Sequence, residues 1–211
     1  MRNALVLAVV ALFAVCPAWS QTVDEGELKS VGEQDIVFES YTGPHSVFDT
    51  AEEIVGIGRA LALGIRGGAA RADFFGLYSV IRAVDPAETS KLDADIIVLE
   101  PRAGVDHIRN LRRIIAGYVE TAFGYSRADA ELLAVFTTYY NAVYRGRTAE
   151  LAERYSAAVM ANLTAENAGL ALSYRDWPGK TRLLVPLSRG GVLPAGSPAL
   201  GAAAVDRMRR G

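Results

Sequence analysis

The stretch from Ser126 to Gly146, SRADAELLAVFTTYYNAVYRG, constrains the fold more than any other part of this sequence. It opens with a Ser-x-x-Asp pattern that can cap a helix, and it closes with a glycine, the residue type that most often ends one. Between Glu131 and Arg145 it carries no charge, and apolar side chains surround most of the helical cylinder. A helix that is apolar on most sides is buried on most sides. The sequence therefore predicts one long central helix, with Phe136 in the core.

The preceding segment, from Val105 to Phe123, is predicted to be an amphipathic helix, because its apolar residues recur three and four positions apart. Only Gly124 and Tyr125 separate the two helices, so they should pack as an antiparallel hairpin. Two further helices are predicted, from Thr50 to Ile65 and from Thr148 to Val159. Short runs rich in β-branched and apolar residues predict four strands: Asp35–Tyr41, Phe75–Val84, Asp95–Leu99 and Leu183–Leu187. The expected fold is a single α+β domain over residues 35–187, with a small sheet of about four strands under a helical layer.

Two glycines lie inside the predicted helix that begins after Thr50, which opens with a Thr-x-x-Glu capping pattern. Each glycine in a helix interior costs about 1 kcal/mol relative to alanine. We therefore expect close backbone packing at Gly56 and Gly58 to offset that cost.

The first twenty residues have the pattern of a secretory signal peptide, with Arg2 before an apolar run from Ala4 to Val15. The run is short for a membrane span, which needs about 20 residues. Cleavage is therefore favoured over a retained anchor, and no membrane span is expected afterwards. Acylation at Cys16, the single cysteine, is the less favoured alternative, since Val15 and Pro17 fit poorly around a lipidated cysteine.

We predict that the mature chain begins at Gln21, because Ala18-Trp19-Ser20 presents small residues at the two positions that a signal peptidase reads. Amino-terminal sequencing or the intact mass of the exported protein measures this directly. A species that starts at an acylated Cys16 would identify a lipoprotein instead.

The rest of the composition limits the partners of this chain. The formal net charge is −2, which gives no indication of nucleic-acid binding. Cleavage before Gln21 would leave no cysteine, and hence neither a disulfide nor a thiol nucleophile. The polar, acidic segment 21–34 is expected to be a mobile lead-in, and the segment 188–211, rich in Gly, Ala and Pro, a disordered tail.

Several segments, taken in order, resemble the spirochaetal 83/100 kDa antigen family, best known as a Borrelia antigen. The segments are Tyr41–Pro44, Ile57–Gly58, Asp106–Ile115, Gly117–Tyr118, Gly124–Ser126, Tyr140–Gly146 and Asp176–Thr181. The resemblance covers residues 35 to 187 and implies an exported spirochaetal protein of the cell envelope, in the periplasm or at the cell surface. It implies no reaction. The Borrelia type continues into a long charged helical region, so a function carried by that extension is not expected of this sequence.

Candidate binding residues gather on the polar face of the predicted Val105 helix. They are Asp106, His107, Arg109, Asn110, Arg112 and Arg113. Residues four apart share a helix face, so the arginines could hold a carboxylate or phosphate of an envelope component. A solvated or salt-bridged face is the alternative. His45, in the loop before a helix, is a second candidate for anion binding, or simply part of a Gly-Pro turn.

An enzyme acting on cell-wall glycans is the alternative to a non-enzymatic binding or scaffolding protein. Its acid–base set could come only from Glu39, Asp106 and His107, and nothing in the sequence fixes the separation of the two carboxylates that such an enzyme needs. The common nucleotide-binding, metalloprotease and serine-hydrolase motifs are absent. With two histidines, no multi-histidine metal site is expected, and no cofactor is predicted.

Overall fold

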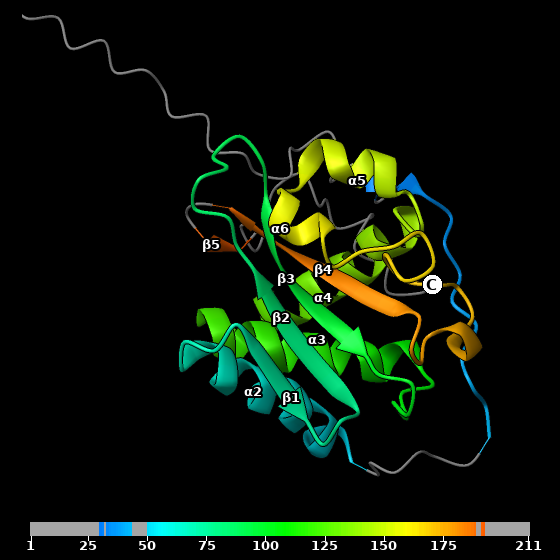
Figure 1. The fold of residues 1–211 in the computed structure, drawn as a ribbon. Coiled ribbons are helices and arrows are strands. Elements are labelled where there is room, and N and C mark those ends of the chain that lie inside the picture. The colour runs from blue at the N-terminus through cyan, green and yellow to red at the C-terminus, as the bar shows by residue number, and fades with distance from the viewer. Residues whose placement is uncertain (1–29, 32, 44–49, 189–190, 193–211) are drawn as a thin grey trace, which may run out of the picture.

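The computed structural model describes residues 30–31, 33–43, 50–188 and 191–192, which form an α+β fold on one antiparallel sheet (Figure 1). The described strands pair in chain order: β1 (Arg71–Phe74), β2 (Tyr78–Ala83), β3 (Asp93–Leu99), β4 (Thr181–Ser188) and β5 (Gly191–Val192). The described helices are α2 (Ala51–Arg66), α3 (Ile108–Phe123), α4 (Arg127–Val143), α5 (Thr148–Arg154), α6 (Ala157–Met160) and the 3-10 turn η1 (Tyr174–Asp176). The predicted fold class is confirmed, and the fifth strand adds only two residues.

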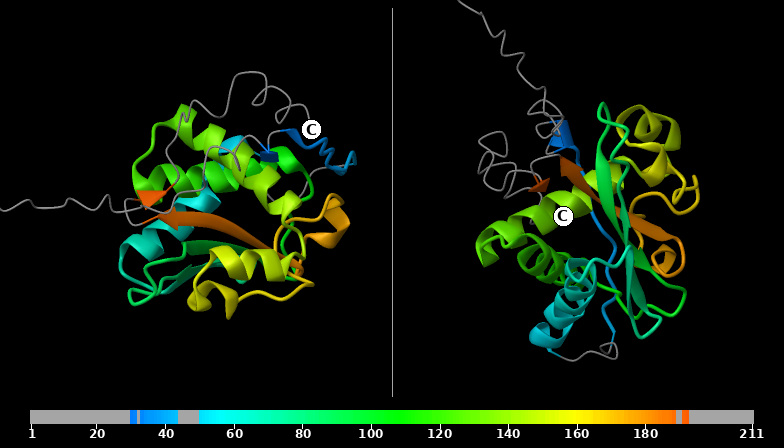
Figure 2. Two further views of the ribbon diagram at one scale, coloured as in Figure 1. Left: turned by 90° about the horizontal axis from the view of Figure 1, so that it is seen from above. Right: turned by 60° about the vertical axis from the view of Figure 1, so that its left-hand side comes forward.

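Helices α2, α3 and α4 cover one face of the sheet, and α5 and α6 lie on the other (Figure 2). The strand register places four apolar residues directly opposite one another across four strands: Ala72, Val80, Ile97 and Leu183. Directly opposed residues of antiparallel strands point to the same face. All four are buried, so this row joins the sheet to the core under the helical layer.

Helix α4 lies at the centre of the helical layer, as the sequence predicts. Ten of its seventeen residues are buried, and Phe136 has no exposed surface. Ser126 caps the helix by accepting a hydrogen bond from the backbone N–H of Asp129. Gly124, in the left-handed conformation, ends α3 and allows the tight link into α4. The two helices therefore form the predicted antiparallel hairpin.

Helices α2 and α3 meet through two glycines. A Cβ atom at Gly58 would lie 1.9 Å from the carbonyl oxygen of Ile114, and one at Gly117 would lie 2.3 Å from that of Val55. The backbones are therefore too close for any other residue at either position. The prediction of close packing is right for Gly58 and wrong for Gly56, where a Cβ would meet nothing within 4 Å.

A buried carboxylate ties the sheet to α3. Asp95, fully buried on β3, accepts two hydrogen bonds from the Arg82 guanidinium at 2.8 and 2.9 Å, and one from the Tyr118 hydroxyl at 2.6 Å. Burial, followed by the charge of Asp95, raises the pKa of Tyr118 far above its usual value, so its hydroxyl keeps its proton and donates. The charge of Asp95 is thus neutralised within the core by Arg82.

The predicted strand Asp35–Tyr41 is wrong. The segment is extended, but its backbone bonds go to two different parts of the chain. Glu39 N–H donates to the carbonyl of Leu172, and Tyr41 N–H donates to that of Asp106. Because no single partner strand runs beside it, the segment forms one isolated bridge and stays outside the sheet.

The predicted strand Phe75–Val84 begins too early, and β1 was missed. Phe75 and Gly76 both have positive φ, at 53° and 64°, and the N–H of Leu77 donates to the carbonyl of Phe74. These are the features of a tight hairpin turn between β1 and β2. Phenylalanine is unusual in such a turn, and for that reason the sequence pattern did not reveal it.

The predicted continuous helix from Thr148 to Val159 is broken at Tyr155, which has an extended backbone. The break follows from pairing with the start of β3. Leu92 N–H donates to the carbonyl of Arg154, and Ser156 N–H donates to the carbonyl of Leu92. Tertiary hydrogen bonds therefore replace the helical ones at this point.

The ends of the domain differ in part from expectation. Val31, within the predicted mobile lead-in, is buried in the core. Ser188 and the residues of β5 are strand, although the predicted disordered tail begins at 188. The signal peptide, Cys16, residues 21–29, and residues 189–190 and 193–211 lie outside the described residues.

Candidate functional site

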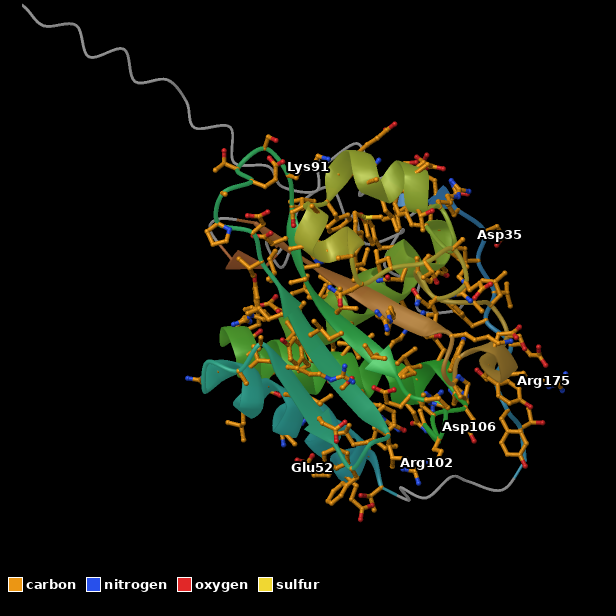
Figure 3. The ribbon with its side chains drawn as sticks, in the orientation of Figure 1. Asp35, Glu52, Lys91, Arg102, Asp106 and Arg175 are labelled. Carbon is orange, nitrogen blue, oxygen red and sulfur yellow. The ribbon has the colours of Figure 1, made fainter. Side chains whose placement is uncertain are left out.

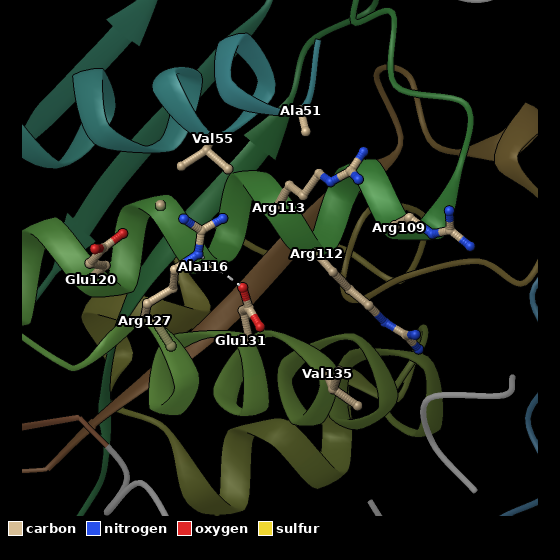
Figure 4. Close-up of a pocket in the computed structure, with 12 residues that line it drawn as sticks. Ala51, Val55, Arg109, Arg112, Arg113, Ala116, Glu120, Arg127, Glu131 and Val135 are labelled. Carbon is tan, nitrogen blue, oxygen red and sulfur yellow. Dashed lines mark hydrogen bonds and ion pairs between the residues drawn. The ribbon is translucent and has the colours of Figure 1, made fainter. Parts of the chain in front are cut away.

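A groove of about 390 Å³ runs along α3, between the start of α2 and the first half of α4 (Figure 4). Its lining residues come from all three helices: Ala51, Val55, Arg109, Arg112, Arg113, Ala116, Gly117, Glu120, Arg127, Ala130, Glu131 and Val135. The α3 members recur at intervals of three and four, so they form a single stripe along that helix. The groove is thus built by one face of α3 and closed by its two neighbours.

Among the residues that the structure describes, positive charge is in surplus at one end of the groove. Figure 4 shows the side chains of Arg109, Arg112 and Arg113 spread around the start of α3, with Glu120 towards the other end. Arg113 donates to the amide oxygen of Asn110 at 2.9 Å, which leaves its charge uncompensated. Arg109 is exposed and forms no ion pair with any residue that the structure describes.

The other end of the groove is closer to neutral. Arg127 pairs with Glu131 at 3.2 Å, one helical turn apart on α4. Glu120 pairs with Arg59 of α2 at 3.4 Å, and Arg59 also binds Glu52. These pairs are partly exposed, so each contributes little to stability, about 0–1 kcal/mol. Because the charges at this end are paired, the net positive charge of the groove lies at the Arg109 end.

Arg112 is the most deeply held of these arginines. Its Nε donates to the hydroxyl of Thr138 at 3.1 Å, and its guanidinium lies 5.9 Å from the ring centres of both Phe38 and Tyr139. Burial lowers the pKa of Arg112 to about 10, so it remains charged at neutral pH. A cation in such a site gains more from a bound anion than a fully solvated one does.

The predicted site residues separate into two groups. Arg109, Arg112 and Arg113 line the groove, whereas Asp106, His107 and Asn110 are not among its lining residues. These three have structural contacts.

His107 caps α3, which begins at Ile108 rather than at Val105, and its Nδ1 accepts from the N–H of Arg109 at 3.1 Å. Burial, followed by the charge of Arg109, lowers the pKa of His107, which favours the neutral imidazole that this cap requires. The carbonyl of Asp106 accepts from Tyr41 N–H. His45 lies outside the described residues.

The two carboxylates of the enzyme alternative, Glu39 and Asp106, do not line the groove. Glu39 accepts from the Ser173 hydroxyl at 2.7 Å and pairs with Arg175 at 3.6 Å. Figure 3 shows Asp106 and Arg175 at the same end of the molecule. Neither Glu39 nor Asp106 is among the described residues that line the groove.

Sequence reasoning missed the residues that α4 and α2 bring to the groove. Arg127 and Glu131 of α4, and Ala51 and Val55 of α2, lie outside the Asp106 segment that the sequence motifs singled out. One signal was available, because Arg127 and Glu131 are four apart near the start of the helix that must pack against the Val105 segment. The small apolar residues that line the groove gave no signal in the sequence, because alanine and glycine are common in any helix.

Other residues of the resemblance hold the fold together. The Asn141 side chain donates to the carbonyls of Thr137 and Leu184 and accepts from the N–H of Leu184, which fastens α4 to β4. Arg145 donates to four backbone carbonyls: those of Glu166, Ala168, Gly169 and Lys180. Both side chains are occupied by structural bonds.

Among the described residues, no group of three or more His, Cys, Asp or Glu side chains could hold a metal ion. Of the helices that the structure describes, none has the length and apolar character needed to cross a membrane.

These features define a class of protein: an α+β domain with a five-stranded antiparallel sheet and a helix-lined groove of net positive charge. Within that class, the chain belongs to the Borrelia P83/100 protein family, whose model matches residues 25–197. The resemblance inferred from the sequence motifs is thereby confirmed. No curated protein and no solved structure matches the chain.

Proposed function

We propose that this protein is an exported, non-enzymatic component of the cell envelope that binds an anionic envelope molecule in the groove along α3. The observation that carries the proposal is the surplus of positive charge at the Arg109 end. The chain as a whole is slightly acidic, with a net charge of −2, so this local surplus is not a consequence of overall composition. Export is supported by the signal-peptide pattern of residues 1–20.

The groove is suited to holding an anion rather than to transforming one. Guanidinium groups bind carboxylate and phosphate oxygens through charge-assisted hydrogen bonds, often in pairs. Arginine keeps its proton at neutral pH and so cannot exchange protons with a substrate as a general acid or base must. The carboxylates beside it, Glu120 and Glu131, are paired with Arg59 and Arg127. Binding is therefore the activity that this arrangement supports best.

We expect the double variant Arg109→Ala with Arg113→Ala to fold normally and to lose most of its binding to isolated envelope fractions. Both side chains contribute little to stability, since neither has an ion pair within the described residues. Binding by wild type should also weaken with added salt, because screening acts over about 10 Å at 0.1 M. Sedimentation with envelope fractions at several salt concentrations measures both effects, and a thermal melt checks the fold.

A matched control removes two exposed arginines that do not line the groove, Arg102→Ala with Arg147→Ala. This control changes the net charge by the same amount and should bind as wild type does. Equal binding by wild type and both double variants would rule out the groove as the binding site. Unfolding of the Arg109 and Arg113 variant would instead identify these arginines as structural.

A further inference from the structure

The floor of the groove is apolar, although its rim is charged. Six lining residues are small or aliphatic: Ala51, Val55, Ala116, Gly117, Ala130 and Val135. Val55, Ala116, Ala130 and Val135 are buried within the fold, so the surface that they offer lies at the bottom of the groove rather than on its shoulders. An anion that is bound only through its charge would gain nothing from contact with an apolar floor.

The depth of the floor follows from the close crossing of α2 and α3. Gly117 must be glycine because the carbonyl of Val55 occupies the place of a Cβ. Ala116 beside it adds only a methyl group, so α3 presents almost bare backbone between Arg113 and Glu120. The result is an apolar stretch between Arg113 and Glu120, and Figure 4 shows the side chain of Arg127 reaching towards it from α4.

The size of the groove limits its occupant to one small molecule. Pockets for small ligands hold about 300–1,000 Å³, and this groove, at about 390 Å³, lies at the low end of that range. The rim beside the floor carries Glu120 and Glu131, which are paired with Arg59 and Arg127, so this part of the rim offers an anionic bilayer no surplus of positive charge. A single free molecule therefore fits the groove better than a membrane surface does.

We infer that the groove binds a small amphipathic anion, with a phosphate or carboxylate head at Arg109 and Arg113 and a short apolar chain over the floor. This inference rests on the proposed function, since it specifies the ligand of the same site. Charge complementarity places the head at the arginine end, and the apolar floor receives the chain. Burial of each methylene is worth about 0.8 kcal/mol, which corresponds to about a fourfold gain in affinity.

Two ligands with the same head and different bodies test the inference. Calorimetry or NMR titration should show that hexyl phosphate binds at least about tenfold more tightly than glycerol phosphate, because partial burial of several methylenes multiplies their gains. Ethyl phosphate and butyl phosphate should fall between the two in order of chain length. All are used as monomers in solution, without vesicles.

Variants separate the head from the chain. Val55→Thr keeps the shape of the floor but adds a hydroxyl, so it should reduce the gain with chain length and leave glycerol phosphate unaffected. Val37→Thr, at an exposed position that does not line the groove, makes the same chemical change as a control and should alter the binding of neither ligand. The Arg109 and Arg113 double variant should weaken every phosphate by a similar factor.

The outcomes are distinct. If hexyl phosphate binds no better than glycerol phosphate, while the arginine variant still weakens both, the amphipathic ligand is wrong and anion binding stands. If no phosphate or carboxylate binds wild type, both proposals fail. Binding to anionic phospholipid vesicles without binding to the monomeric phosphates would overturn the inference in favour of a membrane surface.

Discussion

Replacing Gly58 by alanine is expected to destabilise the protein by about 3 kcal/mol, the upper end of the usual cost of overpacking. The added Cβ would lie 1.9 Å from the carbonyl oxygen of Ile114 and 2.6 Å from the backbone nitrogen of Tyr118. Both obstacles are backbone atoms of α3, which cannot rotate away as a side chain could. Urea or thermal unfolding of the purified variant measures the loss.

The matched control lies two residues away in the same helix. Gly56→Ala makes the identical chemical change where a Cβ meets nothing within 4 Å. It should stabilise the protein by about 0.5–1 kcal/mol, because alanine is the better helix former. If both substitutions changed the free energy of unfolding in the same direction, the close crossing of α2 and α3 would not be the reason for glycine at position 58.

Phe136→Ala is expected to cost about 3–5 kcal/mol, through the lost burial of the ring and the cavity left behind. The ring has no exposed surface, and it packs against Tyr140 with 5.6 Å between ring centres. Domains of this kind are stable by about 5–15 kcal/mol, so the variant would lose much of its folding margin.

Phe75→Ala serves as the comparison, because it removes the same ring from a side chain that is 80% exposed. A change within about 0.5 kcal/mol is expected there. A melting temperature for Phe136→Ala equal to that of wild type would contradict the central place of α4.

Elements with strong local signals could be predicted from the sequence. The Thr50–Glu53 capping box is present, with both reciprocal hydrogen bonds, and α4 begins directly after Ser126. The apolar run Asp95–Leu99 is strand and all of its residues are buried, because a strand that is covered on both faces has a nearly continuous apolar sequence. In each case the residues that define the element lie within it.

Elements set by distant parts of the chain could not be predicted. Tyr155 breaks a helical pattern because its neighbours bond to Leu92, more than sixty positions earlier in the sequence. The Asp35–Tyr41 segment has strand composition, yet its backbone partners, Leu172 and Asp106, belong to two separate loops. No local pattern contains that information.

The candidate site was predictable only on one of its three walls. Helical spacing placed Arg109 and Arg113 on one face of α3, and both line the groove. The same spacing could not show that Arg112 would lie beside the rings of both Phe38 and Tyr139, because those rings come from two other segments. His107 shows the converse, since its position at the first turn of α3 makes it a cap rather than a ligand-binding residue.

The pairing of β3 with β4 has a consequence for the order in which the molecule assembles. It joins segments about ninety residues apart, and Asn141 fastens β4 to α4 as well. Contacts between distant segments carry a large loop-closure cost and slow the folding reaction. During synthesis, the sheet cannot be completed until the segment around Leu184 has emerged. The hydrogen bonds that hold α4 against β4 must wait for the same segment. A chain halted before that segment would leave β3 with an open edge, which is a template for association with other chains.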